Sequence, residues 1–436
     1  MMRPLISACL AAMVLSGQAV ADPIRDAVTA DQSYLLSLYK HLHANPELSG
    51  QEVETAKRLA KELRSQGFDV TEGVGGTGVV AVMKNGDGPV VMVRADMDGL
   101  PVTEQTGKPY ASKKKVQRPG GEVGVMHACG HDIHITSLVG TARYLSSNKD
   151  EWSGTLIMIG QPAEETGEGA RAMLEDGLYT RFPVPDHAIA LHDSAGAKAG
   201  TIGLRSGYAM ANVDMVDIIV HGEGGHGAYP HTTKDPIVVG ARIVDALQTL
   251  VSREIDPQAA AVVTVGAFHA GSKHNIISDE AHLQLTVRSY TDEVRNHLLS
   301  GIQRIAKAQA QSAGIAEDRL PEVTWDEHYT PALFNTEAQT ETLAAMFIER
   351  FGADRVLEPA PVMGGEDFAR YHRANRDTES TLFWVGAVPA ADWERTGGDP
   401  TKLPSLHSPF FAPDPEPTIA AGTEAMIAAA LTLFQE

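Results

Sequence analysis

The densest group of side chains able to bind a metal lies in one short stretch, His127 to His134. It reads His-Ala-Cys-Gly-His-Asp-Ile-His and holds three imidazoles, a thiol and a carboxylate. Thiolate and imidazole are ligands for zinc and similar ions, and the Cys-x-His spacing brings Cys129 and His131 to one point if the chain turns tightly at Gly130. The stretch therefore predicts a metal centre, although a histidine-rich turn also occurs as plain polar surface.

A pair of acidic side chains follows a predicted strand. Leu156 to Ile159 is a short apolar run, and Gln161-Pro162-Ala163-Glu164-Glu165 comes directly after it. Adjacent carboxylates repel each other, so a neighbouring cation explains their company better than a solvated surface does.

Two more polar clusters stand at the ends of predicted strands. Arg94 to Asp98 ends the strand that starts at Val90, and His192-Asp193 follows the apolar run Ala188 to Leu191. In open α/β sheets, binding residues gather at the carboxyl ends of the strands. Together with the two stretches above, these clusters favour one shared site over scattered ion pairs and structural histidines.

Short β-branched runs alternate with helical stretches over much of the chain. Apolar positions recur at helical spacing from Ser33 to Arg64, with a break between Pro46 and Gly50, and again from Ile133 to Leu145. This alternation predicts an α/β fold, with a mixed, largely parallel sheet flanked by helices. The strands are expected at residues 68–71, 78–83, 90–94, 156–159, 188–191 and 382–385.

The middle of the chain has a different pattern. Strands are expected at 213–220, 261–268 and 281–290, with helices at 235–251 and 291–313. The order strand, helix, strand, strand, helix, strand is ferredoxin-like. We therefore expect a separate α+β domain inserted into the larger one.

Composition and charge exclude several classes of protein. A chain of 436 residues suggests two or three domains, and 43% hydrophobic with 21% charged residues is ordinary for a globular protein. The 56 acidic and 36 basic side chains leave a net charge of −20. Such a field repels nucleic acid and anionic lipid, so we expect no nucleic-acid partner and no membrane insertion.

The first residues have the pattern of an export signal. A basic start at Arg3, an apolar run from Leu5 to Leu15 and an A-x-A site ending at Ala21 predict cleavage after Ala21. We expect a periplasmic or secreted protein; the alternative is a cytoplasmic protein with an apolar N-terminal helix. Cleavage would leave Cys129 as the one cysteine, without a partner for an internal disulfide.

Two glycine-rich segments match G-x-G-x-x-G by letter. A strand follows Gly73–Gly78, which predicts a hairpin turn, and the helix after Gly222–Gly227 starts only near Asp235, too late to form a phosphate cradle. The sequence has no G-x-x-x-x-G-K-[ST], G-x-S-x-G or H-E-x-x-H motif. Oxidoreductase, nucleotidase and serine-hydrolase functions are therefore disfavoured.

Several stretches resemble the M20 metallopeptidase family, in its aminoacylase-like amidohydrolase branch, which includes hippurate hydrolases and indole-acetyl-amino-acid hydrolases. The resemblance covers nearly all of the chain after the predicted signal peptide, and the matching motifs occur in the same order as in the family. The matching stretches are Arg94–Pro101, Met126–His134, Gln161–Glu165, Gly224–His231, Gly364–Phe368 and Leu406–Ser408.

The resemblance implies a site for two divalent metal ions, zinc or manganese, which ionise a shared water. Glu164 matches the general base of the family, and Asp98 matches a carboxylate that orients a metal-bound ligand. Asp96 lies two residues away, and the sequence does not separate its role from that of Asp98. The implied metal ligands are Cys129, His131, Glu165, His192 and His407.

The sequence pattern and the resemblance together predict the domains. We expect residues 1–21 to form the signal peptide and residues 22–208 and 329–436 to form two parts of a domain that the resemblance makes catalytic. For the inserted residues 209–328 the resemblance implies a lid that also makes a homodimer.

Four residues of this lid are implied to contact substrate. His226 matches a residue that stabilises the oxyanion in the partner subunit's site, and Asn275 one near the scissile carbonyl. Arg288 matches a residue that grips a substrate carboxylate. His231 either lines the site or caps the loop before Asp235.

We therefore expect an exported, metal-dependent amidohydrolase that splits an N-acyl amino acid or a similar small amide. A dipeptidase or other exopeptidase of the same fold is the alternative. A non-catalytic metal-binding protein is a further one, but binding alone does not need Glu164 beside all five ligands.

Overall fold

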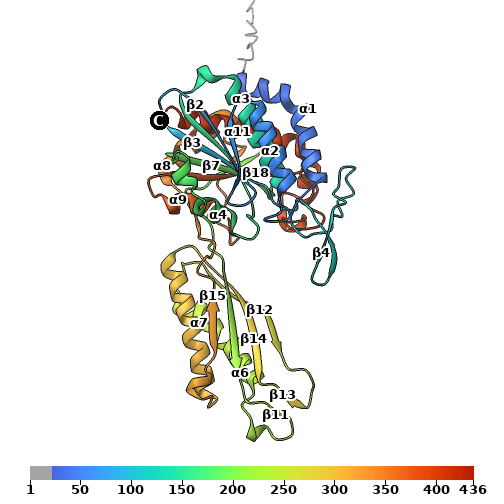
Figure 1. The fold of residues 1–436 in the computed structure, drawn as a ribbon, viewed down its shortest axis with the longest axis vertical. Coiled ribbons are helices and arrows are strands. Elements are labelled where there is room, and N and C mark those ends of the chain that lie inside the picture. The colour runs from blue at the N-terminus through green and yellow to red at the C-terminus, as the bar shows by residue number, and fades with distance from the viewer. Residues whose placement is uncertain (1–21) are drawn as a thin grey trace, which may run out of the picture.

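Two separate sheets organise the chain (Figure 1). The structure is a computed structural model that describes residues 22–436, and the predicted signal peptide, residues 1–21, lies outside the described residues. The larger sheet has eight strands and the smaller has four. Within residues 22–436, no helix combines the length and the apolar character needed to cross a bilayer.

The larger sheet has the order β1-β2-β6-β3-β7-β18-β8-β17. Its four middle strands, β6, β3, β7 and β18, are mutually parallel. Strands β1 and β2 pair antiparallel to their neighbours, and β8 pairs antiparallel with β18 but parallel with β17. The prediction of a mixed, largely parallel sheet is confirmed. The strands are β1 (Asp69–Val74), β2 (Gly78–Asn85), β3 (Val90–Asp96), β6 (Gly154–Gln161), β7 (His187–Lys198), β8 (Ile202–Gly203), β17 (Val356–Leu357) and β18 (Glu379–Val388).

Helices cover both faces of this sheet. Val91 and Val93 of β3 belong to the core on one face, and Met92 between them belongs to the core on the other. Successive strand residues alternate in direction, so a strand covered on both faces is apolar throughout. One face is covered by α1 (Pro23–Ala44), α2 (Val53–Ser65), α3 (His131–Ser147), α8 (Glu337–Phe351) and α11 (Pro415–Leu433), and the other by α4 (Gly169–Glu175), α5 (Leu178–Arg181) and α9 (Ala369–Ala374).

The smaller sheet has the order β12-β14-β10-β15, with every pair antiparallel. Val216 and Ile218 point to a core that includes Ile243 and Ile302, so two helices cover one face. In chain order the elements follow the predicted strand and helix sequence, and residues 209–328 enclose them. They are β10 (Asp214–His221), α6 (Pro236–Thr249), β12 (Ala261–Ala270), β14 (Glu280–Ser289), α7 (Asp292–Ser312) and β15 (Glu322–Trp325). We call these elements, with the segments that connect them, the small domain.

Short strands and one helix complete the chain. The glycine-rich segment Gly73–Gly78 forms the turn of the antiparallel hairpin β1–β2, as predicted, and not a phosphate cradle. The remaining strand pairs are β4 (Lys115–Arg118) with β5 (Gly121–Gly124), β9 (Gly207–Met210) with β16 (Leu333–Asn335), and β11 (Gly225–His226) with β13 (Ile276–Ile277); helix α10 spans Ala390–Thr396.

The structure corrects two expected boundaries. Helix α1 begins at Pro23, ten residues before the expected start, because Asp22 accepts a hydrogen bond from Arg25 N and caps it. Strand β7 continues to Lys198 instead of ending at Leu191, because its pairing with β18 extends that far. His192 therefore lies within β7 and not after it.

Candidate functional site

The predicted site lies where β7 separates from β3. The last residue of β3, Asp96, pairs with Gln161 at the end of β6, whereas the pairing of β3 with β7 already ends at Arg94 and Ala190. The next residues of β7 therefore have no β3 neighbour. This opening at the carboxyl ends of the strands receives the start of α3.

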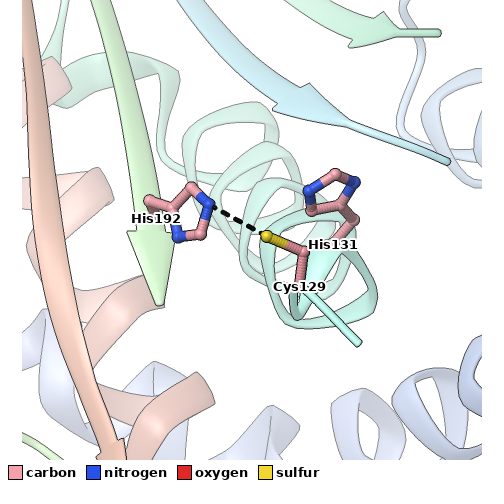
Figure 2. Close-up of side chains that lie close together, drawn as sticks. All are labelled: Cys129, His131 and His192. Atoms are coloured by element: carbon pink, nitrogen blue, oxygen red, sulfur yellow. Dashed lines mark hydrogen bonds between the residues drawn. The ribbon is translucent and has the colours of Figure 1, made fainter. Parts of the chain in front are cut away.

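A glycine turn places two predicted ligands beside β7. Gly130 has φ 75° and precedes α3, and a Cβ there would lie 2.3 Å from Asp193 Oδ1. The position therefore needs glycine for both its backbone conformation and its space. Figure 2 shows the result: Cys129 and His131 flank the turn, and His192 points at Cys129 from β7.

The five predicted metal ligands form one cluster. Cys129 Sγ lies 3.2 Å from His407 Nε2 and 3.6 Å from His192 Nε2. Glu165 Oε2 lies 3.4 Å from His407 Nε2, and Glu165 Oε1 lies 3.9 Å from His131 Nε2. Four stretches that are far apart in the sequence thus place thiol, imidazole and carboxylate donors around one point.

The donors fit a metal centre. His131 Nε2 and Glu165 Oε1 are buried, and neither has a hydrogen-bond partner among residues 22–436. Buried polar atoms in this state cost free energy, which coordination to a metal would recover. Burial, with Glu165 and Glu164 nearby, raises the pKa of Cys129 well above its usual range. A thiolate there therefore needs a bound cation, as a divalent metal would supply.

Asp98 holds two of the ligands in place. Its Oδ1 lies 3.1 Å from His131 Nδ1, and its Oδ2 accepts hydrogen bonds from Ser49 Oγ at 2.6 Å and from Glu165 N at 3.0 Å. Burial acts to raise the pKa of Asp98, but the hydrogen bonds from His131 and Ser49 leave it below the usual value. An ionised Asp98 would hold His131 and Glu165 in a fixed orientation for metal binding.

Asp96 has different neighbours from Asp98, which the sequence could not distinguish. Its Oδ1 lies 2.5 Å from His134 Nδ1, and its Oδ2 lies 3.6 Å from His131 Nε2. Asp193 N donates to His134 Nε2 at 2.9 Å. His134 thus connects Asp96 of β3 to Asp193 of β7 through its two ring nitrogens. It was not among the predicted site residues, although it follows His131 by one helical turn.

Sequence reasoning also missed the part played by Arg94. This side chain is fully buried, and its guanidinium contacts Asp96 Oδ2 at 2.7 Å and Glu366 Oε1 at 2.8 Å. Its Nε donates to Gln161 Oε1 at 2.9 Å. An arginine among the apolar residues of a buried strand was the available signal. The Gly364–Phe368 stretch thereby joins the site through Glu366.

Glu164 borders the cluster beside His131 but, unlike Glu165, has no ion pair with His407 among the described residues. Its Oε2 lies 3.9 Å from His131 Nε2, and 9% of its side chain is exposed. Burial, with Glu366 and Glu165 nearby, raises the pKa of Glu164 well above the usual value for glutamate. Glu164 is therefore a carboxyl group that readily binds a proton at the edge of the cluster.

The four predicted substrate residues are not brought to the cluster within one chain. His226 lies in β11, and Asn275 O accepts from Gly227 N at 3.0 Å, so both belong to the end of the small domain away from the large sheet (Figure 1). His231 is exposed on a neighbouring turn. Arg288 lies at the opposite end, where it donates to Met363 O at 3.2 Å.

Comparison with known proteins gives a consistent assignment. The pattern of peptidase family M20/M25/M40 matches residues 92–430. A hippurate hydrolase of Campylobacter jejuni is 40% identical over 75% of this chain and 82% of its own, and an N-acetyl-L-cysteine deacetylase of Bacillus subtilis is 38% identical over 78% of each. The crystal structure of Bacillus subtilis YxeP, a dinuclear metal binding peptidase of the M20 family, matches with a TM-score of 0.75 and 30% identity, over 93% of this chain and 99% of its own.

Removal of one histidine from the cluster should release metal. We expect His192→Gln to weaken metal binding by at least about 10-fold, since even losing a residue that orients a ligand costs roughly 10–100-fold. Metal content after gel filtration, measured by mass spectrometry, tests this. His187→Gln is the matched control, because His187 lies on the same strand but bonds Gln339 Oε1 at 2.9 Å. Equal metal content in the two variants would remove His192 from the ligand set.

Proposed function

Because the chain belongs to peptidase family M20/M25/M40, we propose that it hydrolyses the amide bond of N-acyl amino acids, yielding a carboxylic acid and an amino acid. It is a metal-dependent amidohydrolase. Two of its relatives are named as an N-acetyl-L-cysteine deacetylase and a hippurate hydrolase. These names support amino acids with an acyl group on the nitrogen as the substrate class.

One observation carries this proposal: the carboxylate of Glu164 borders a cluster of five metal-binding side chains. We propose that these hold two divalent ions per subunit, zinc or manganese. When bound, such ions act as Lewis acids and lower the pKa of water. The proposed ligands are Cys129, His131, Glu165, His192 and His407.

Glu164 is proposed as the general base. Its carboxylate takes a proton from the attacking water and passes it to the departing amine. Burial beside Glu366 and Glu165 favours its protonated form, whereas bound cations favour its ionised form. These opposing effects suit a group that must first accept and then release a proton.

Arg288 is proposed to bind the carboxylate of the substrate. It is half-buried, and its hydrogen bonds go to Thr286 Oγ1 and to Met363 O. Among residues 22–436, no ion pair involves Arg288, because the nearby Asp214 pairs with Arg295 instead. A planar guanidinium without an acidic partner can bind a carboxylate through two parallel hydrogen bonds.

The small domain is proposed to complete the site of a second subunit. His226 and Asn275 lie at the end of that domain away from the metal cluster of their own chain (Figure 1). A homodimer would bring them to the partner's cluster. There His226 would donate a hydrogen bond to the oxyanion, with Asn275 near the scissile carbonyl.

We also propose that the protein acts outside the cytoplasm. The pattern of residues 1–21 supports this, with a basic start, an apolar run and an A-x-A site. N-terminal sequencing of the protein from periplasmic and cytoplasmic fractions tests it, and a first residue of Asp22 in the periplasmic fraction is the expected result.

The two adjacent glutamates should respond differently to substitution. Glu164→Gln should keep its metal and lower turnover by roughly 10²–10⁴-fold, because it removes the base alone. Glu165→Ala should lose metal. Rates on N-acetyl, N-benzoyl and N-indoleacetyl amino acids, with dipeptides in the same assay, measure turnover and test the exopeptidase alternative. Near-normal turnover of Glu164→Gln would exclude this mechanism.

Mixing two inactive variants should restore activity if subunits share their sites. His226→Ala alone should lower kcat by about 10²–10³-fold, because the oxyanion forms only in the transition state. In a mixture with Glu164→Gln, each heterodimer holds one site with both groups intact. Native mass spectrometry verifies that heterodimers are present. If heterodimers form and no activity returns, His226 does not serve the neighbouring subunit.

A further inference from the structure

Glu52 is a buried carboxylate that no predicted role includes. It is completely buried and directly precedes α2, yet its side chain does not cap that helix. Instead, Glu52 Oε1 accepts hydrogen bonds from Gly50 N and from Ala163 N, both at 2.8 Å. Glu52 Oε2 accepts a hydrogen bond from Thr77 Oγ1 at 2.6 Å. One carboxylate thus joins the loop before α2, the β1–β2 hairpin and the turn that carries the two glutamates.

Ala163 has a strained backbone next to Glu164. Its φ is 49°, in the left-handed region that residues other than glycine rarely adopt. Such a conformation persists only where the surroundings hold it, and it is common at active sites. On the carbonyl side, Ala163 O accepts from Glu168 N and Gly169 N at 3.2 Å each. On the amide side, the partner that holds it is Glu52.

We infer that Glu52 is a positioning residue for amide hydrolysis. By holding Ala163 N, its carboxylate maintains the strained turn and so sets the direction of Glu164, the next residue. The inference rests on the proposed function of Glu164 as the base. Thr77 in turn orients Glu52, which gives the glycine-rich hairpin a part in the site although it binds no phosphate.

The same loop offers a matched control. Glu47 is also buried, and its Oε2 also accepts two backbone hydrogen bonds, from Glu54 N at 2.8 Å and Thr55 N at 2.9 Å. These donors lie in the first turn of α2, and neither belongs to the turn that carries the two glutamates. Substitution of Glu47 therefore removes a comparable buried carboxylate without touching the glutamate turn.

The test compares Glu52→Ala with Glu47→Ala by thermal unfolding, metal content, kcat and KM. We expect both to lower Tm. Glu52→Ala alone should lower kcat by about 10- to 100-fold, since small misplacement of a catalytic group has effects of this size. Its KM and metal content should stay close to those of Glu47→Ala. Glu52→Gln should keep most of the activity, because the amide oxygen can still accept from Ala163 N.

Equal kcat values for folded Glu52→Ala and Glu47→Ala would overturn the inference, as would a loss of kcat that only follows lost metal. If Glu52→Ala does not fold, the kcat of Thr77→Val tests the inference instead, because this substitution removes the hydroxyl that donates to Glu52 and orients it. It should lower kcat several-fold, with Thr77→Ser restoring it, and an unchanged kcat would reject the inference.

Glu164→Gln is measured in parallel. If that variant stays active, the proposed base is wrong; if it is inactive while Glu52→Ala matches its control, only the positioning role is wrong.

Discussion

The site depends on a group of carboxylates that is buried where β3 and β6 end, and on the positive groups and hydrogen-bond donors that balance their negative charge. Ionised carboxylates out of water are costly unless cations or hydrogen-bond donors face them. Arg94, from β3 itself, supplies one fixed cation to this group, and two imidazoles of α3, His131 and His134, supply further partners. Two buried atoms of the ligand cluster, His131 Nε2 and Glu165 Oε1, have no hydrogen-bond partner among the described residues. The carboxylates gathered there are Asp96, Asp98, Glu164, Glu165, Glu366 and Asp367.

This charge balance also joins the two parts of the larger domain. Arg94 lies before the small domain in the sequence and Glu366 after it, yet they form a fully buried ion pair. His407, from the second part, is bound to the turn before α3 because its backbone N–H donates a hydrogen bond to Ala128 O at 2.8 Å. Since the donors come from both parts, the cluster forms only when the two parts of the larger domain come together. Such an arrangement makes metal binding and folding of this domain interdependent.

The residues of the small domain that are proposed to contact substrate lie at its two ends. Arg288 stands at the end nearest the larger domain, where its guanidinium contacts Met363 O. The β11–β13 pair, with His226, stands at the other end (Figure 1). An elongated sheet covered by helices on one face can therefore serve two sites at once. Under the proposed function, a single chain holds the metals and the base but lacks the oxyanion donor.

The sequence by itself determined the local features of this protein. The alternation of apolar residues, the caps such as Asp235 and the glycine turn at Gly130 depend on near neighbours. The longer strands of both sheets, the order of the small domain and the metal-binding residue types could therefore be predicted, whereas short strands such as β11 and β13 were not. Only the tertiary structure decided what those residues touch. It separated Asp96 from Asp98, placed Arg94 against Glu366, extended β7 along β18 and set Glu52 beneath Ala163. These outcomes could not be predicted because they are contacts across long stretches of chain, which no local periodicity encodes.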